Sequence, residues 1–183
     1  MEEFNEFNQR LYETSIFVGK MLLAGLFFHL VLFVNPDTSF FQTVFASLMN
    51  NLLNFAGLEA SHSGIRIITG EAVYVIVQDC LGWKSMAVFL ALIYASTSRA
   101  LENLNYIIGG LTVLVLANIV RVFSTIYLSE IGLISFEVIH GVLWRWSLTI
   151  VVLVLWFYWL KNVKDKEKFE RRLKARLKAL KNR

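Results

Sequence analysis

Apolar residues in this chain fall in long blocks separated by short polar breaks. A bilayer core about 30 Å thick is crossed by roughly 20 apolar residues in an α-helix. Four blocks approach that length, the second being the shortest: residues 15–34, 83–98, 106–128 and 139–160. The pattern therefore predicts a mainly α-helical protein, a polytopic membrane bundle of about four transmembrane helices.

The long break between the first two blocks carries two further patterns. Residues 40–58 (SFFQTVFASLMNNLLNFAG) have helical spacing with an apolar and a polar face, which is typical of an amphipathic helix on a membrane surface. The alternative is a fifth, weakly apolar span. Residues 65–78 (IRIITGEAVYVIVQ) are rich in β-branched residues around a TGEA turn, which predicts a small β-hairpin. Its second arm ends next to Cys80, the single cysteine of the chain.

Composition and charge support this organisation. Hydrophobic residues make up 56% of the chain, above the roughly 45–50% of soluble domains, and the mean hydropathy is +0.56. Residues 161–183 carry 11 Lys/Arg against 3 Asp/Glu, whereas residues 1–160 carry 7 against 11. We therefore separate a membrane-embedded domain, residues 1–160, from a basic tail, residues 161–183, that contacts anionic lipid and not nucleic acid.

The basic tail also predicts orientation. Positively charged segments stay in the cytoplasm, and counting back through four spans places the N-terminus there too. Residues 35–82 and 129–138 then face outward from the plasma membrane. The acidic N-terminal residues do not resemble the basic start of a cleavable signal peptide, so the first apolar block is expected to be a retained anchor.

Ionisable groups inside spans are costly and are candidates for function. Arg121 lies 15 residues into the third span, and Asn118, three residues earlier, shares its helix face. His140 opens the fourth span, and Arg145 follows five residues deeper. In the predicted topology Cys80, Arg121 and His140 meet at one depth, near the outer surface.

These residue types fit a thiol nucleophile. A thiolate requires a nearby positive charge or a base. Arg121 supplies a charge that does not titrate, His140 can move protons near neutral pH, and a helix beginning near Leu81 would add its N-terminal dipole. Asp79 would oppose the thiolate, or would hold Arg121 or a backbone donor. The alternative hypotheses are that Cys80 only packs, that Arg121 snorkels to the headgroups, and that His140 is simply hydrogen-bonded.

Three short motifs follow one another within these helices. They are Cys-x-Gly in VIVQDCLGWKS (Cys80, Gly82), Asn-x-x-Arg in ANIVRV (Asn118, Arg121) and His-Gly in VIHGVLW (His140, Gly141). In this order and spacing, roughly residues 40–155 resemble the exosortase/archaeosortase family of membrane transpeptidases. Two departures are Leu81, where the family usually has Ser or Thr, and the small number of spans. Arg145 is the alternative to His140 as the third catalytic residue.

The sequence carries no metal-ligand cluster and no nucleotide-binding loop, so we expect no cofactor or metal. The resemblance implies a membrane cysteine protease or transpeptidase with sortase-like chemistry. Its partners would be exported proteins whose C-terminal sorting signal has a short motif, a hydrophobic helix and a basic end. Cys80 would attack a peptide carbonyl, Arg121 would stabilise the thiolate and oxyanion, and His140 would transfer protons, supported by Asp79, Gly82 and Asn118. The product would be joined to a membrane lipid or another amine. Two alternatives are a protease that only hydrolyses and a non-enzymatic assembly or transport subunit.

Overall fold

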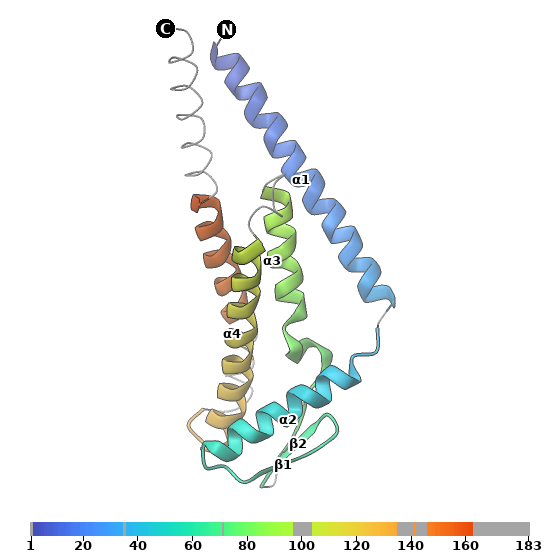
Figure 1. The fold of residues 1–183 in the computed structure, drawn as a ribbon, viewed down its shortest axis with the longest axis vertical. Coiled ribbons are helices and arrows are strands. Elements are labelled where there is room, and N and C mark those ends of the chain that lie inside the picture. Colours follow the sequence, from blue (N-terminus) through green and yellow to red (C-terminus); the bar gives the residue numbers. More distant parts are fainter. Residues whose placement is uncertain are drawn as a thin grey trace.

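A computed structural model describes residues 2–34, 36–70, 72–96, 104–134, 141 and 146–162. The structure is mainly α-helical and carries one small sheet (Figure 1). In chain order its elements are α1 (Glu2–Val34), α2 (Ser39–Phe55), β1 (Ala60–Ser63), β2 (Arg66–Thr69), β3 (Ala72–Val75), a 3₁₀ turn η1 (Gln78–Leu81), α3 (Trp83–Ser96) and α4 (Leu104–Glu130). A last apolar helix, Leu148–Asn162, is called the C-terminal helix below.

Within the described ranges, two helices are long and apolar enough to cross a membrane: α4 and the part of α1 from Leu11 to Val34. The helix α3 and the C-terminal helix are apolar but shorter. The helix α1 extends on its N-terminal side beyond the predicted span of residues 15–34, because residues 2–14 contain no glycine or proline and several good helix formers.

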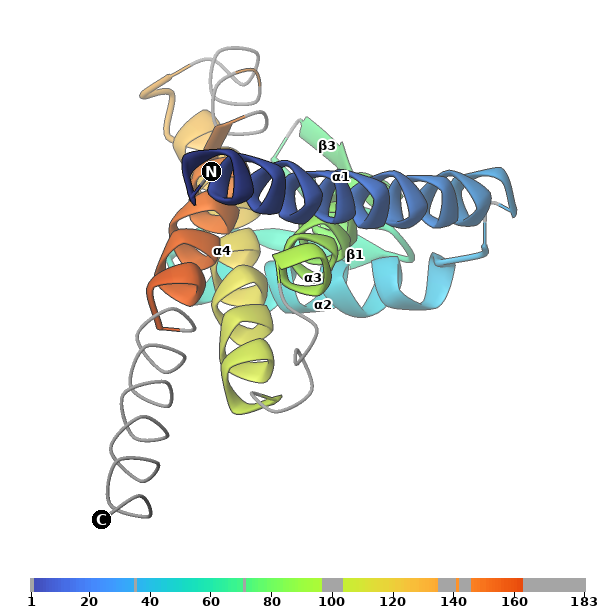
Figure 2. The ribbon, with the colours of Figure 1, turned by 90° about the horizontal axis from the view of Figure 1, so that it is seen from above.

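The helices α3, α4 and the C-terminal helix form a packed group (Figures 1 and 2). The indole Nε1 of Trp156 donates to Ser96 Oγ over 2.8 Å and joins the C-terminal helix to α3. A Cβ atom on Gly110 would lie 2.4 Å from the ring of Phe89, so this glycine allows α4 to approach α3 closely. The buried apolar residues of the group are Phe89, Ile93, Leu114, Val152 and Trp159.

The helix α2 lies across the end of α3 that begins at Trp83 and the end of α4 that finishes at Glu130 (Figure 1). Its residues Ala46, Met49 and Leu53 are fully buried, whereas Phe40 and Phe55 are highly exposed. The sequence prediction of a helix over residues 40–58 is confirmed apart from its last turn. The exposed phenylalanines suit a helix whose outer apolar side meets lipid.

The predicted hairpin is confirmed by β2 and β3, which pair antiparallel with Thr69 opposite Ala72. The sheet nevertheless has a third strand, because β1 pairs antiparallel with β2 in the order β1-β2-β3. The sequence of β1, ASHS, is small and polar and carries no apolar alternation, which explains why the pattern did not predict it.

Candidate active site

A single turn connects the sheet to the helical bundle and carries Cys80. Just before this turn in the chain, Ile76 N donates to Ile65 O over 2.9 Å, and Gln42 Nε2 from α2 donates to Ile76 O over 3.0 Å. Cys80 is in η1, with its amide bonded to Val77 O at 2.9 Å. The chain leading to the thiol is therefore held by both the sheet and α2.

Gly82 separates the turn from α3. Its φ is +72°, in the left-handed region that favours glycine, and its carbonyl accepts from Ser85 N and Met86 N at the start of α3. The expectation that a helix begins near Leu81 is therefore off by two residues. Cys80 lies in the 3₁₀ turn that precedes the helix, and not within the first turn of α3.

Asn118 from α4 joins the turn to the bundle. Its Nδ2 donates to Cys80 O over 2.8 Å, and the side chain is only 1% exposed. A Cβ on Gly82 would lie 2.8 Å from Asn118 Cγ, inside contact distance. The Cys-x-Gly and Asn-x-x-Arg motifs therefore contact each other directly, and each explains the residue types of the other.

Arg121 lies one helical turn beyond Asn118 and is 5% exposed. Its positive charge acts on both Cys80 and Asp79. An arginine that snorkels would extend its head group away from the protein interior. Arg121 instead places its charge inside the protein, close to the thiol.

Several effects set the acidity of the thiol, which is 7% exposed. Burial is the largest and raises the pKa of Cys80 above its ordinary value. A backbone hydrogen bond at Val77 and the charge of Arg121 act to lower this pKa, while the Asp79 carboxylate raises it. Burial outweighs the stabilising charge, so the resting thiol is protonated at neutral pH and needs a base to become a nucleophile.

Asp79 forms an ion pair with Lys84, with a distance of 2.7 Å between Oδ1 and Nζ. Both side chains are nearly half exposed. The sequence analysis did not name Lys84 as a partner of Asp79, whose charge also acts on Cys80 and Arg121. The ion pair bridges Gly82, from η1 to the first turn of α3.

The remaining predicted residues, His140 and Arg145, lie outside the described residues. Within the described residues, no group of three or more His, Cys, Asp or Glu side chains could hold a metal ion. The cluster of Cys80, Gly82, Asn118 and Arg121 is thus the part of the predicted site that the structure brings together.

Sequence reasoning missed a polar cluster at the end of α4. Glu130 Oε1 accepts from Tyr74 OH at 2.6 Å and from Thr69 Oγ1 at 2.8 Å, which fastens β2 and β3 to α4. Burial first, and then Glu130, raise the pKa of the Tyr74 hydroxyl. One signal was available: Glu130 ends a long apolar helix, where a carboxylate needs a partner.

These observations define the class of protein first. It is a helical protein with helices long and apolar enough to cross a membrane, and it carries a buried thiol beside an arginine at the junction of a small sheet and the bundle. Residues 9–158, about four fifths of the chain, match the family described as transmembrane exosortase. The chain belongs to the transmembrane exosortase family, whose members are transpeptidase-like. Searches of curated proteins and of solved structures returned no match.

Proposed function

We propose that this protein is a membrane cysteine transpeptidase that cleaves the C-terminal sorting signal of exported proteins at the outer membrane face. The observation that carries the proposal is the contact between the two motifs, with Asn118 bonded to the Cys80 carbonyl and Arg121 buried beside it. Membership of the exosortase family supports the transpeptidase class.

The proposed reaction begins with attack of Cys80 Sγ on the carbonyl carbon of the scissile peptide bond. His140 takes the thiol proton and passes it to the leaving amine as the C–N bond breaks. A thioester then joins Cys80 to the new C-terminus of the substrate. The guanidinium of Arg121 offsets the negative charge on the carbonyl oxygen during both steps. Arg145 is the alternative third residue.

The second step releases the product. An amine of a membrane lipid or another acceptor, deprotonated by His140, attacks the thioester and forms a new amide while the thiol regains its proton. Water at this step would give a free carboxylate instead. Burial of Cys80 favours transfer, because a dry site limits competition from bulk water.

The proposal also includes an orientation. Four spans place both termini in the cytoplasm, with α2, the sheet and Cys80 on the outer side. The basic tail supports this orientation through the positive-inside rule. A substrate anchored by a C-terminal helix would present its cleavage site at that same surface.

The function is tested by comparing protein C-termini in membranes of the native host with wild-type protein, Cys80→Ala or Cys80→Ser. We expect a set of exported proteins to keep a hydrophobic C-terminal helix in both variants and to lose it in the wild type. Ser85→Ala is the matched control, since it removes a small side-chain heteroatom five residues away and should leave processing intact.

Two outcomes would change the proposal. If the C-termini are the same in all strains while each variant accumulates normally, Cys80 is a packing residue and the non-enzymatic alternative is favoured. If processing depends on Cys80 but the products carry only a free carboxylate by mass spectrometry, the protein is a hydrolase and not a transpeptidase.

A further inference from the structure

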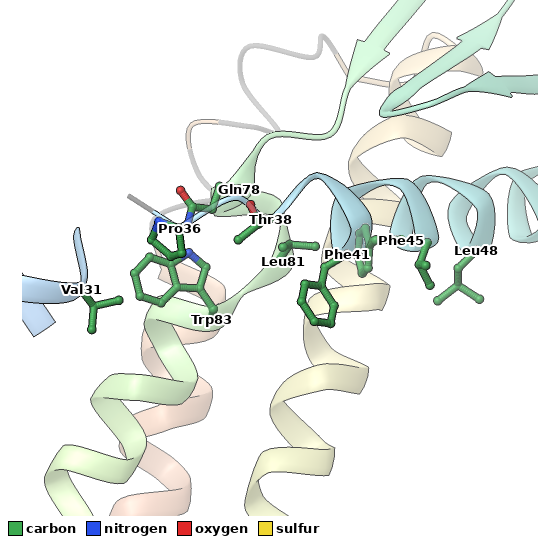
Figure 3. Close-up of a pocket in the computed structure, with 10 residues that line it drawn as sticks. Val31, Pro36, Thr38, Phe41, Phe45, Leu48, Gln78, Leu81 and Trp83 are labelled. Carbon is green, nitrogen blue, oxygen red and sulfur yellow. The ribbon is translucent and has the colours of Figure 1, made fainter. Parts of the chain in front are cut away.

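Two apolar cavities lie beside the Cys80 turn. The outer cavity, of about 480 Å³, lies between α2, the end of α1 and the segment from Gln78 to Trp83 (Figure 3). The second, of about 830 Å³, lies between α1 and α3, from Met21 and Tyr94 to Val31 and Trp83. Both are lined by Val31 and Trp83, so we treat them as one continuous groove, called the α1–α3 groove.

The groove follows from how the helices diverge. The helix α1 leans away from α3 toward its Val34 end (Figure 1), so side chains do not fill the space between them. Among the larger apolar side chains that line this cavity, each helix also contributes two small residues: Ala24 and Gly25 on α1, Ala87 and Ala91 on α3. Inside a membrane, small residues allow another helix to approach closely.

The outer end of the groove is formed by one face of α2. Phe41, Val44, Phe45 and Leu48 have the i, i+3, i+4, i+7 spacing of a single helix face, and all four line the cavity. Opposite them Gln78 and Leu81, on either side of Asp79 and Cys80 in η1, also line it (Figure 3). Whatever fills this end lies against the turn that carries the thiol.

Polar groups at the same end point to a peptide. The Trp83 indole Nε1 is buried and donates to no acceptor within the described part of the chain. The Gln78 side-chain amide lies at the same end of the cavity as Thr38 and Trp83 (Figure 3). A buried donor without an acceptor is costly. A peptide supplies a carbonyl acceptor at every residue, whereas the hydrocarbon part of an acyl chain supplies none.

We propose that the α1–α3 groove receives the apolar C-terminal helix of the substrate, with the residues just before that helix at Gln78, Leu81 and Trp83. This inference rests on the proposed function. Trp83 to Tyr94 is 11 residues of rise, about 16 Å, so the groove holds roughly three turns of an added helix. Lys20, bonded to Tyr94 O at 3.4 Å, marks the inner end of the groove.

The test measures binding without catalysis. A photoreactive benzoylphenylalanine is placed at Val88, which lines the groove, or at Val113 on α4, which does not; both valines are 45% exposed. The Cys80→Ala protein is reconstituted into phosphatidylcholine–phosphatidylglycerol nanodiscs. The probe is a biotinylated peptide with about 20 Leu/Ala residues and a Lys-Arg-Lys end. We expect at least tenfold more peptide cross-linked from position 88 than from position 113.

Equal cross-linking at both positions, or cross-links from position 88 to lipid alone, would overturn the groove proposal. The result is independent of the test of function. Loss of processing in Cys80→Ala with equal cross-linking refutes only the groove. Selective cross-linking with unchanged C-termini in Cys80→Ala refutes only the catalytic role.

A second variant tests the groove in the active protein. Ala91→Phe fills the groove, and Val113→Phe adds similar bulk to an exposed face of α4. We expect Ala91→Phe to lower processing of a helix-bearing substrate at least tenfold and Val113→Phe to leave it as in the wild type, with both variants unfolding in detergent at the wild-type temperature. Equal processing by the two variants would contradict the inference.

Discussion

Position 82 sets two requirements that only glycine meets together. Its backbone has φ +72°, and its α-carbon packs against the amide of Asn118. The first requirement alone favours glycine by about 1–2 kcal/mol. The second links this glycine to the position of Cys80, because the same amide bonds the Cys80 carbonyl.

Gly82→Ala should therefore cost more than Gly64→Ala. Gly64 also has a positive φ, +57°, but an added Cβ there meets nothing within 4 Å. We expect Gly64→Ala to lose about 1 kcal/mol of stability and to keep processing activity. Gly82→Ala should lose activity as well, because the Asn118 amide must move. Thermal unfolding in detergent and the C-terminal processing assay check this, and equal behaviour of both variants would contradict it.

The thiol of Cys80 gives a second prediction at the residue scale. Burial raises its pKa, so alkylation by iodoacetamide should be slow at pH 7 and rise about tenfold per pH unit until the pKa is reached. Asp79→Asn removes a negative charge and should shift the curve to lower pH. Arg121→Gln removes a positive charge and should shift it to higher pH.

The protein unfolded in sodium dodecyl sulfate is the control for this titration, because its thiol has left the buried site. The native curve should lie at higher pH than the unfolded one. Coincident curves, or shifts of both variants in the same direction, would show that the charges of Asp79 and Arg121 do not reach the thiol.

At the scale of elements, the small sheet is stable only through its attachments. Each strand has four residues, and so small a sheet is marginal in isolation. Glu130 at the end of α4 bonds Thr69 of β2 and Tyr74 of β3, and Gln42 of α2 bonds the segment that follows β3. The helices α2 and α4 thereby fix the strand that leads to Cys80.

Glu130→Ala should loosen this attachment. It leaves the Thr69 hydroxyl, which is almost fully buried, without its acceptor, at a cost of about 1–3 kcal/mol. We expect a lower unfolding temperature and faster amide exchange in β2 and β3, measured by hydrogen–deuterium exchange. Glu59→Ala, an exposed carboxylate just before β1, is the control and should change neither. Unchanged exchange in Glu130→Ala would refute the attachment.

At the scale of the whole molecule, the arrangement of the helices creates both the candidate site and the groove beside it. The helix α2 crosses the ends of α3 and α4 (Figure 1), and the Cys80 turn lies where these elements meet the sheet. Cys80 accordingly packs in one apolar cluster with residues from α2, the sheet and α4, among them Met49, Ile67 and Val122. Because α1 diverges from α3, the α1–α3 groove beside this turn stays open.

The sequence by itself determined the features that depend on local periodicity and residue chemistry. Helical spacing predicted α2, β-branched residues around TGEA predicted β2 and β3, and the motifs around Cys80 and Arg121 indicated the family. These features can be predicted from the sequence because they depend on residues that are neighbours on one helix face or in one strand. The position of Arg121 within an apolar block was enough to single it out.

Only the tertiary structure decided which groups touch. Asp79 pairs with Lys84, Asn118 bonds the Cys80 carbonyl, and Glu130 fastens the sheet to α4. The groove is a property of the angle between α1 and α3, which no local pattern encodes. The balance that leaves the Cys80 thiol protonated is likewise tertiary, because burial by residues far apart in the sequence outweighs the nearby charge of Arg121.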